Sequence, residues 1–433
     1  MGEDKISVRE FEPERDAAAV EEMEKQCDVS PAGSCGEDDD SEKMQTRKKK
    51  KKKKKKKIKA PTTLFVDLLG DPLCRVRYFS NRVMLIAEYG EQKQIVGVVR
   101  ASIKTVTRGS KGPDGSPAYA RVAYILGLRV SPHHRRMGVA TRLVEAAEEW
   151  CRKEGGAEYA YMATERSNAA SLNLFTVKFS YTPFRFPSVL VQPVHAHPLK
   201  LSKGAAVLPL PPAVAEPLYR RLFAASSEFF PKDISAVLAN PLTLGTFMAI
   251  PSWEAAPPPW DPWRTDDAGG LPPSFAVMSL WNSKEMFRMQ VKGGSAAARL
   301  VLRWWRAADE RLPWAGIPSL PDLFRPFGVY FMYGLHAEGK GGGGLMRTLC
   351  RLAHNLARED RGCAAVVAEL GRDDPVREGV PHWRSLSWDE DVWCMKKLVA
   401  ASPSSAEEEE EDYDNWVSSK PSTDVVFVDP RDF

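Results

Sequence analysis

The sequence lacks the features that would place it in or on a membrane. No window approaches the roughly 18 consecutive apolar residues that a membrane-spanning helix requires, and the opening MGEDKIS contains no apolar stretch of a secretory signal. Gly2 follows Met1, but position 6 is Ile6 where a myristoylation signal has Ser or Thr. These absences predict a soluble intracellular protein without a lipid anchor.

Cysteine is scarce and scattered. The seven cysteines include no C-x-x-C pair and no Cys/His cluster at the spacing of a zinc site. We therefore expect a reducing compartment and no structural metal. The 433 residues exceed what one compact core usually holds, so we also expect two or three domains.

Positive charge is concentrated in one tract. Residues 48–57 are all lysine and, with Arg47 and Lys59, contribute +12 to a net charge of +4, so the rest of the chain carries −8. Residues 30–61 hold almost nothing apolar to bury, which predicts a disordered lysine-rich insertion. The tract fits a nuclear-import or nucleic-acid-contacting arm, or a solvated expansion without a partner. No aromatic side chains stand near it for stacking, so we expect no nucleic-acid binding beyond the tract.

Hydrophobic periodicity divides the chain into two similar halves. Residues 1–200 read as β-α, three β, α, β, α, β, and residues 201–400 weakly repeat this order. We predict an α/β fold, with a mixed α+β sheet in each of two tandem domains, of which the second is degenerate. Residues 401–433 form an acidic tail that contains a candidate terminal strand.

The expected elements of the first half are strands at 7–11, 83–88, 95–103, 123–130 and 159–164 and helices at 16–27, 141–153 and 168–178, with a polar loop at 108–117. Those of the second half are a linker at 209–212, helices at 213–223 and 345–358, strands at 245–250, 275–281, 286–291, 328–335 and 363–370, and the terminal strand at 425–428. A Pro/Trp-rich loop at 251–273 contains Trp253, Trp260 and Trp263. These tryptophans either form a partner-binding patch or pack the loop itself.

The most informative stretch is LRVSPHHRRMGVAT, residues 128–141. A strand ends, a Pro-containing turn follows, and Gly138 with Ala140 lets backbone N–H groups converge at the first turn of a helix. Such a turn binds anions, because unpaired amides and the positive end of the helix dipole point at one place. Neighbouring arginines and histidines add positive charge, so a pyrophosphate fits. The alternative is an ordinary strand-to-helix turn, with His133 and His134 as surface residues.

This stretch resembles the acetyl-CoA loop of the GNAT acetyltransferase superfamily, R/Q-x-x-G-x-G/A, which here reads RRMGVA from Arg135 to Ala140. A second GNAT signature, NAASLNLF, begins at Asn168. The resemblance covers residues 6–193 and implies tandem GNAT-like domains, the first of which takes acetyl-CoA as co-substrate without a metal. The residues that it assigns to acetyl-CoA are Leu128, Arg129, Val130, Arg135, Arg136, Met137, Gly138, Val139, Ala140, Thr141, Asn168, Ser171 and Phe175.

A closer resemblance extends over nearly the whole chain. ILGLRVSP at 125–132, EFFPKDI at 228–234 and FVDPR at 427–431 are similar to the hookless family of plant probable N-acetyltransferases. This implies an N-acetyltransferase that modifies a protein amine, on a histone or a transcription regulator. It also implies a regulator of plant growth and hormone response in the nucleus, with the cytoplasm as a second location.

Acetyl transfer makes three chemical demands on this site. An amine with a pKa of ~10.4 needs a base, the thioester carbonyl needs donors for its oxyanion, and the thiolate needs a proton. A backbone N–H at the end of the 126–130 strand is the expected oxyanion donor. Many GNAT enzymes protonate the thiolate with a Tyr at the position of Phe175, so Tyr181 or a water is expected to substitute. The nearest acidic candidate for the base is Glu165, whose alternative role is a solvated carboxylate at a helix start.

Three functions remain open from the sequence. The first is an N-acetyltransferase that works by direct attack, without an acyl-enzyme. The second is a non-catalytic regulator that binds acyl-CoA as a sensor, and the third is a scaffold without CoA. In the second half, the glycines at 339 and 341–344 form either a second phosphate cradle or a flexible loop.

Overall fold

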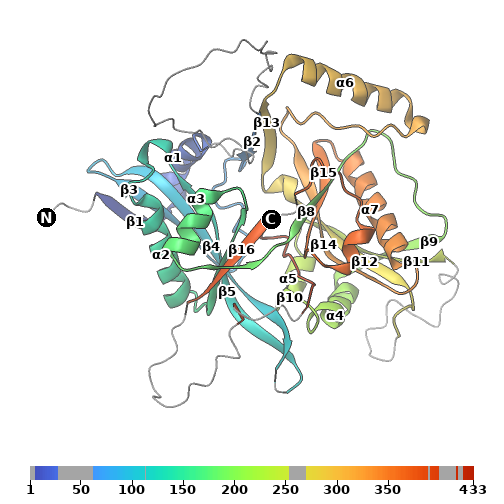
Figure 1. Ribbon diagram of the computed structural model, residues 1–433, viewed down its shortest axis with the longest axis horizontal. Helices are drawn as coiled ribbons and strands as arrows, with labels where there is room; N and C mark the ends of the chain where they lie inside the picture. Colours follow the sequence, from blue (N-terminus) through green and yellow to red (C-terminus); the bar gives the residue numbers. More distant parts are fainter. Residues whose placement is uncertain are drawn as a thin grey trace, which may run out of the picture.

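The computed structural model describes residues 5–27, 62–112, 114–252, 270–388, 391–398, 416–417 and 423–433. They form two lobes, each built on a β-sheet (Figure 1). The expected lysine-rich insertion, the three tryptophans of the Pro/Trp-rich loop and the acidic run of the tail lie outside these residues. Among the helices described, none has both the length and the apolar character needed to cross a membrane.

Among the described strands, the first sheet has one parallel pair, which lies at its centre. β5 (Pro117–Val130) and β6 (Tyr159–Glu165) run parallel and are joined by α2 (Val139–Lys153), which packs on one face. α1 (Pro13–Lys25) packs on the other face. The strand order is β1 (Ile6–Glu10), β3 (Asn81–Tyr89), β4 (Gln94–Lys111), β5, β6, β16 (Asp391–Lys397) and β7 (Thr182–Arg185), with β10 (Glu228–Pro231) paired to β4.

The second sheet repeats this central unit. β14 (Gly328–Glu338) and β15 (Cys363–Leu370) run parallel and are joined by α7 (Gly342–Glu359). The strand order is β8 (Ser188–Pro193), β15, β14, β12 (Phe275–Asn282), β11 (Thr243–Pro251) and β9 (Ala205–Leu210). Outside this sheet lie α4 (Pro212–Phe223), α5 (Ile234–Leu238), the ribbon of β2 (Thr62–Asp67) with β13 (Arg288–Gly293), and α6 (Ala296–Arg311).

The two sheets exchange strands. β8 comes from the N-terminal half but pairs with β15 in the second sheet, whereas β16 comes from the C-terminal half and lies between β6 and β7 in the first. The domain boundaries expected at residues 200 and 400 therefore do not separate the two sheets. Neither sheet is complete without a strand from the other half of the chain.

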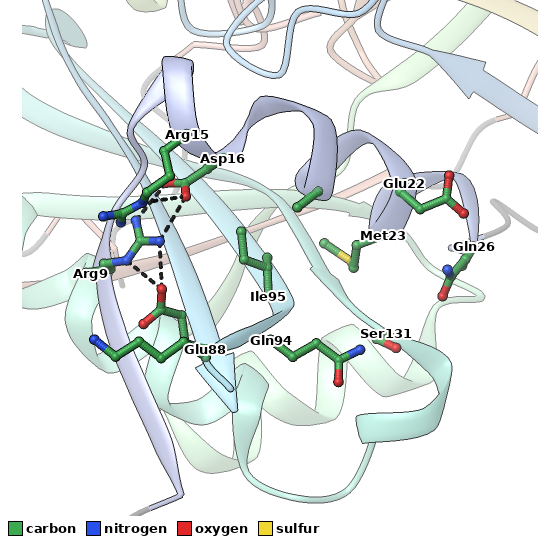
Figure 2. A pocket seen from close by; sticks show the side chains of 12 residues that line it. Arg9, Arg15, Asp16, Glu22, Met23, Gln26, Glu88, Gln94, Ile95 and Ser131 are labelled. Carbon is green, nitrogen blue, oxygen red and sulfur yellow. Dashed lines mark hydrogen bonds and ion pairs between the residues drawn. The ribbon is translucent and has the colours of Figure 1, made fainter. Parts of the chain in front are cut away.

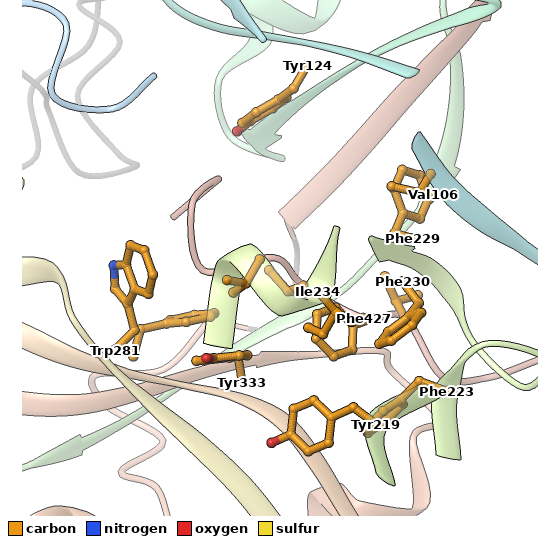
Figure 3. Close-up of a cluster of buried hydrophobic side chains, with 14 of the residues drawn as sticks. Val106, Tyr124, Tyr219, Phe223, Phe229, Phe230, Ile234, Trp281, Tyr333 and Phe427 are labelled. Atoms are coloured by element: carbon orange, nitrogen blue, oxygen red, sulfur yellow. The ribbon is translucent and has the colours of Figure 1, made fainter. Parts of the chain in front are cut away.

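A single apolar core joins the facing sides of the two sheets. Figure 3 shows its centre, where Tyr219 and Phe223 of α4, Phe230 of β10 and Tyr333 of β14 surround Phe427. The same cluster includes Tyr124 of β5 and aromatic residues of β6 and β12. Because this shared core is large and apolar, the two lobes are expected to move little relative to each other.

Several elements differ from the sequence-based expectation. The expected polar loop at 108–117 is mostly strand, since β4 continues to Lys111 and pairs with Pro117 of β5. The expected linker at 209–212 is the end of β9 and the start of α4, where Pro212 occupies the first helical turn. Instead of a terminal strand at 425–428, only Val426 forms a bridge, with Glu228 of β10. α3 (Ala169–Leu172) is short and continues as a π-helix, Asn173–Lys178.

We expect Gly97→Ala to destabilise the fold by about 1–3 kcal/mol, because a methyl group there meets α2. A Cβ at Gly97 would lie 2.9 Å from both Leu143 Cδ1 and Val139 Cγ1. Gly344→Ala is the matched control: it lies in α7 with nothing within 4 Å, and we expect a small gain in stability. Urea unfolding of both variants measures the difference, and equal effects would contradict this packing of α2 on β4.

Candidate functional site

The two central strands of the first sheet separate after a short paired stretch. β5 is in register with β6 only at Val122–Tyr159, Ala123–Ala160 and Tyr124–Tyr161. Beyond Tyr124, β5 continues to Val130 with β4 as its partner on the other side, while β6 pairs with β16. This separation leaves one edge of β5 without a strand partner over residues 125–130, a length of about 17 Å.

A β-bulge at Gly127 accompanies the separation. Gly127 has φ +62°, and a Cβ there would lie 2.9 Å from Nη1 of Arg100. The Arg100 side chain is 1% exposed and donates from both Nη atoms to Glu24 of α1, at 3.0 and 3.1 Å. Residue 127 is therefore a position for glycine, because its φ is positive and a side chain there would meet this buried ion pair. Leu128, Arg129 and Val130 follow at the partly exposed end of β5.

The turn after β5 brings backbone donors together. Gly138 is the N-cap of α2 with φ +87°, and Arg136 also has positive φ, +63°. Within the described chain, the amides of residues 136–141 have no hydrogen-bond acceptor. These amides and the helix dipole favour an anion at this position.

Cationic side chains surround this turn. Arg135, Arg136 and Met137 are exposed, and the first turn of α2 carries no acidic residue. The Lys178 Nζ donates to Oγ1 of Thr141 at 2.9 Å, which holds a further positive charge at the helix start. Val139 is buried under the turn and Ala140 is half-buried, so their amides rather than their side chains serve the site. The structure thus brings together the expected loop residues from 135 to 141.

The second signature is a cap followed by a π-helix. Asn168 caps α3 by accepting from the Ser171 amide at 3.2 Å, and its Nδ2 donates to Oγ1 of Thr164 at 3.0 Å. Asn168 and Ser171 therefore form the helix start beside β6. Phe175 lies in the π-helical turn and is 1% exposed, packed edge-to-face on Tyr181 with ring centroids 5.1 Å apart. A π-turn in a helix is frequent at functional sites.

The structure does not bring Tyr181 to the turn. Its ring is 2% exposed and its hydroxyl has no hydrogen-bond partner among the described residues. Burial raises the pKa of this phenol well above its ordinary value, and the charge of Glu148 adds to the shift. Glu148 lies on the third turn of α2, about 15 Å along the helix from Gly138. A buried phenol with a raised pKa holds its proton tightly, so Tyr181 is a poor acid for the leaving thiolate.

Glu165 lies at the open end of β6. It is partly exposed and faces Asp391 of β16 in the strand register. Burial of Asp391 raises its pKa to about 6, with a contribution from the nearby Glu165 charge. Glu165 is four residues beyond Tyr161, about 13 Å from the point where β5 and β6 close.

The second sheet has the same geometry but a different turn. Gly334 (φ +59°) forms a bulge in β14, and Gly341 (φ +89°) caps α7. The turn between them is shorter and carries Lys340 in place of paired arginines. The glycines at 339 and 341–344 thus form an ordered turn and helix start.

The separation of β14 from β15 is filled. A Cβ at Gly334 would lie 2.6 Å from the Tyr219 ring. Gly334 and Leu370 enclose, with Val426 and Phe427, a space of only about 10 Å³, which barely admits one water. The second domain therefore has no room for an acyl chain between these strands.

A cavity of about 600 Å³ lies between α1 and the β3–β4 hairpin, beside the start of the turn (Figure 2). Arg9 donates to Asp16 Oδ2 at 2.6 Å and to Glu88 Oε1 at 2.7 Å, and it holds the pKa of Asp16 well below its usual range. Because both of its arginines, Arg9 and Arg15, are already ion-paired, this cavity is a poorer site for a diphosphate than the turn. In the described part of the chain no group of three His, Cys, Asp or Glu side chains could hold a metal.

Sequence comparison agrees with the geometry. Residues 60–181 match the acetyltransferase (GNAT) family. A probable N-acetyltransferase HLS1-like of Arabidopsis thaliana is 43% identical over 452 residues, covering 99% of both chains. The acetyl transferase GW6a of Oryza sativa subsp. japonica is 48% identical over 438 residues, covering 99% of this chain and 97% of that protein.

Structural comparison agrees on the fold. N-myristoyltransferase of Saccharomyces cerevisiae, crystallised with myristoyl-CoA, superposes with a TM-score of 0.51 at 7% identity, over 93% of this chain and 81% of that one. At this identity the likeness concerns the fold alone. The sequence matches, which span nearly the full length of each relative, show that this chain belongs to the GNAT acetyltransferase family.

Proposed function

We propose that this protein transfers the acetyl group of acetyl-CoA to an amine of a protein in the nucleus, and thereby regulates plant growth and hormone response. The observation that carries the cofactor assignment is the turn into α2, where the unpaired amides of residues 136–141 lie at a helix start beside exposed Arg135 and Arg136. The free edge of β5 leads from this turn to the point where β6 closes on it. A diphosphate at the turn and an extended pantetheine arm along β5 use both features.

The reaction is direct acyl transfer. The amine nitrogen forms the new bond to the thioester carbon, and the carbon–sulfur bond breaks. The acetylated amine, now an amide, and CoA then leave. A backbone N–H of residues 126–130 stabilises the oxyanion. No acyl-enzyme is needed, and the described cysteines are buried.

The leaving thiolate has no phenol beside it at position 175. A thiol with a pKa of ~8.5 leaves as the anion without an acid, so water can supply its proton. Phe175 also favours a second candidate, a protein that binds acyl-CoA and transfers slowly or not at all. The two candidate functions differ in whether the protein turns over acetyl-CoA, not in whether it binds it.

Acetyl-CoA should bind to the wild type and bind at least tenfold more weakly to Gly138→Asp. Aspartate strains a positive-φ position and places a negative charge at the diphosphate site. Gly341→Asp is the matched control, because it introduces the same strain and charge at the second turn. Calorimetric titration measures all three proteins. Equal weakening by both substitutions would contradict the assignment of the site to the first domain.

Phe175→Tyr should raise kcat for CoA release with lysine peptides by about tenfold or more, because it adds an acid near the leaving group. Phe179→Tyr, at the C-cap of the same π-helix, is the control and should change kcat little. If the wild type shows no CoA release and Phe175→Tyr creates it, the natural protein is an acyl-CoA-binding regulator. No release from either protein would count against acetyl transfer.

The nuclear assignment is tested at the lysine tract, which lies outside the described residues. Replacing residues 48–57 with an equal number of glycines and serines should shift a fluorescent fusion from nucleus to cytoplasm, because import through this tract depends on its charge. Arginine at all ten positions is the control and should preserve nuclear accumulation. Unchanged localisation of the Gly/Ser variant would remove the import role.

A further inference from the structure

Residues 429–433 lie between the two sheets and are held there by ion pairs and aromatic contacts. Arg431 is 3% exposed and donates to Asp429 Oδ2 and to Asp233 Oδ2, both at 2.7 Å. Phe433 stacks on Phe331 of β14, with ring centroids 4.4 Å apart. The side chain between these anchors, Asp432, is therefore fixed in position.

Asp432 reaches the point where β5 and β6 separate. Its Oδ2 accepts from the Tyr161 hydroxyl at 2.8 Å and forms an ion pair with Lys104 of β4. Tyr161 stacks on Tyr124, with ring centroids 4.7 Å apart. This tyrosine pair is the last in register before the strands part. Asp432 thus stands over the closed end of the free β5 edge.

Buried polar atoms without partners gather at the same place. Among the described residues, Asp432 Oδ1, Ser102 Oγ and Arg75 Nε are buried and have no hydrogen-bond partner. Ser102 faces Tyr124 in the β4–β5 register, and Nη2 of Arg75 donates to the Asp432 carbonyl at 3.3 Å. A buried polar group without a partner is costly, so a cluster of three points to a missing polar guest.

Asp432 Oδ1 and Ser102 Oγ can each accept a hydrogen bond, so a donor group fits as that guest. Burial raises the pKa of Asp432, although Lys104 opposes the shift. Burial and the carboxylates of Asp391 and Asp432 raise the pKa of Glu369 to about 8. The charged and titratable groups that face this place are Lys104, Arg75, Tyr124, Tyr161, Glu369, Asp391 and Asp429.

Aromatic rings complete the surroundings. Trp393 of β16 stacks on Tyr161, with ring centroids 5.5 Å apart, and its Nε1 donates to Glu369 Oε1 at 3.0 Å. The Tyr161 ring is thus covered by Tyr124 and Trp393, and the Lys104 ammonium lies 5.5 Å from its centroid, so the Asp432 carboxylate rather than an open ring face attracts an ammonium guest. A phosphate or carboxylate guest would instead face the Asp432 carboxylate and be repelled.

We propose that the acceptor binds here as a primary ammonium, beside the Tyr124–Tyr161 pair, and that Asp432 Oδ1 takes its proton. The proposal rests on the proposed acetyl transfer and assigns its amine site. One N–H bond of the ammonium breaks and one O–H bond forms on Asp432, so the neutral amine attacks the thioester carbon. The proton later passes from Asp432 to solvent. Asp432 replaces Glu165 as the base, because its hydrogen bond to Tyr161 places it where β5 and β6 separate, whereas Glu165 lies about 13 Å further along β6.

Asp432→Asn should lower kcat for acetylation of n-butylamine by about 100-fold, while the dissociation constant for acetyl-CoA stays within twofold. The remaining activity should rise with pH, because the variant depends on amine that is already deprotonated in solution. Asp322→Asn, at an exposed carboxylate in a surface ion pair with Arg325, is the control and should keep wild-type kcat.

A second variant separates catalysis from folding, because Asp432→Asn leaves Lys104 buried without its partner. Lys104→Met with Asp432→Asn removes the ion pair as a whole and should restore the melting temperature but not kcat. Recovery of kcat in the double variant would overturn the proposal, since the role of Asp432 would then be to pair Lys104.

One readout does not depend on turnover. n-Butylammonium chloride should raise the melting temperature of the wild type more than tetramethylammonium chloride at the same concentration, and this difference should vanish in Asp432→Asn. Acetyl-CoA binding without any butylammonium effect would overturn the amine site and leave the cofactor site intact. If the wild type does not bind acetyl-CoA, that result would instead contradict the proposed function itself.

Discussion

The site depends on the separation of two parallel strands. If β5 and β6 stayed paired along their length, the backbone groups of residues 125–130 would be used within the sheet and no edge would remain for a ligand. The Gly127 bulge and the Arg100–Glu24 ion pair stabilise β5 in its separated course. β16 supports β6 from its other side, so β6 is not left as an isolated strand. The geometry of the first domain thus relies on a strand from the other half of the chain.

Both halves have the same strand, bulge, glycine-capped helix and parallel strand, but only the first leaves room for a ligand where its parallel strands part. In the first, the turn between bulge and helix is long and basic. In the second, the turn is short, and Tyr219 and the 426–427 segment pack where the strands part. The second domain therefore contributes structure to the first: it supplies β16 and shares the aromatic core around Phe427. The exchange of β8 for β16 makes the two halves mutually dependent.

Local signals predicted what is local in the structure. The glycine at 138, the basic residues before it and the amphipathic helix after it belong to one continuous segment, and the structure places them as the sequence indicated. Partners distant in the chain were not predictable. Nothing in the pattern around 391–397 distinguishes a strand of the first sheet from one of the second, because hydrogen-bond partners are not encoded in strand periodicity.

Asp432 was missed for the same reason. FVDPR at 427–431 was noted as a family phrase, but Asp432 directly after it was not. The hydrogen bond between Asp432 and Tyr161 joins residues 271 positions apart. The sequence analysis also missed the helix α6. Its apolar residues are exposed rather than packed on a sheet: Leu300, Val301, Trp304 and Trp305.

The most direct test is a crystal structure of the full chain with coenzyme A. The account predicts one molecule, with its diphosphate within hydrogen-bond distance of the amides of residues 136–141 and its pantetheine arm along residues 125–130 of β5. Coenzyme A bound at the second turn, around Gly341, or bound with its arm away from β5, would contradict it.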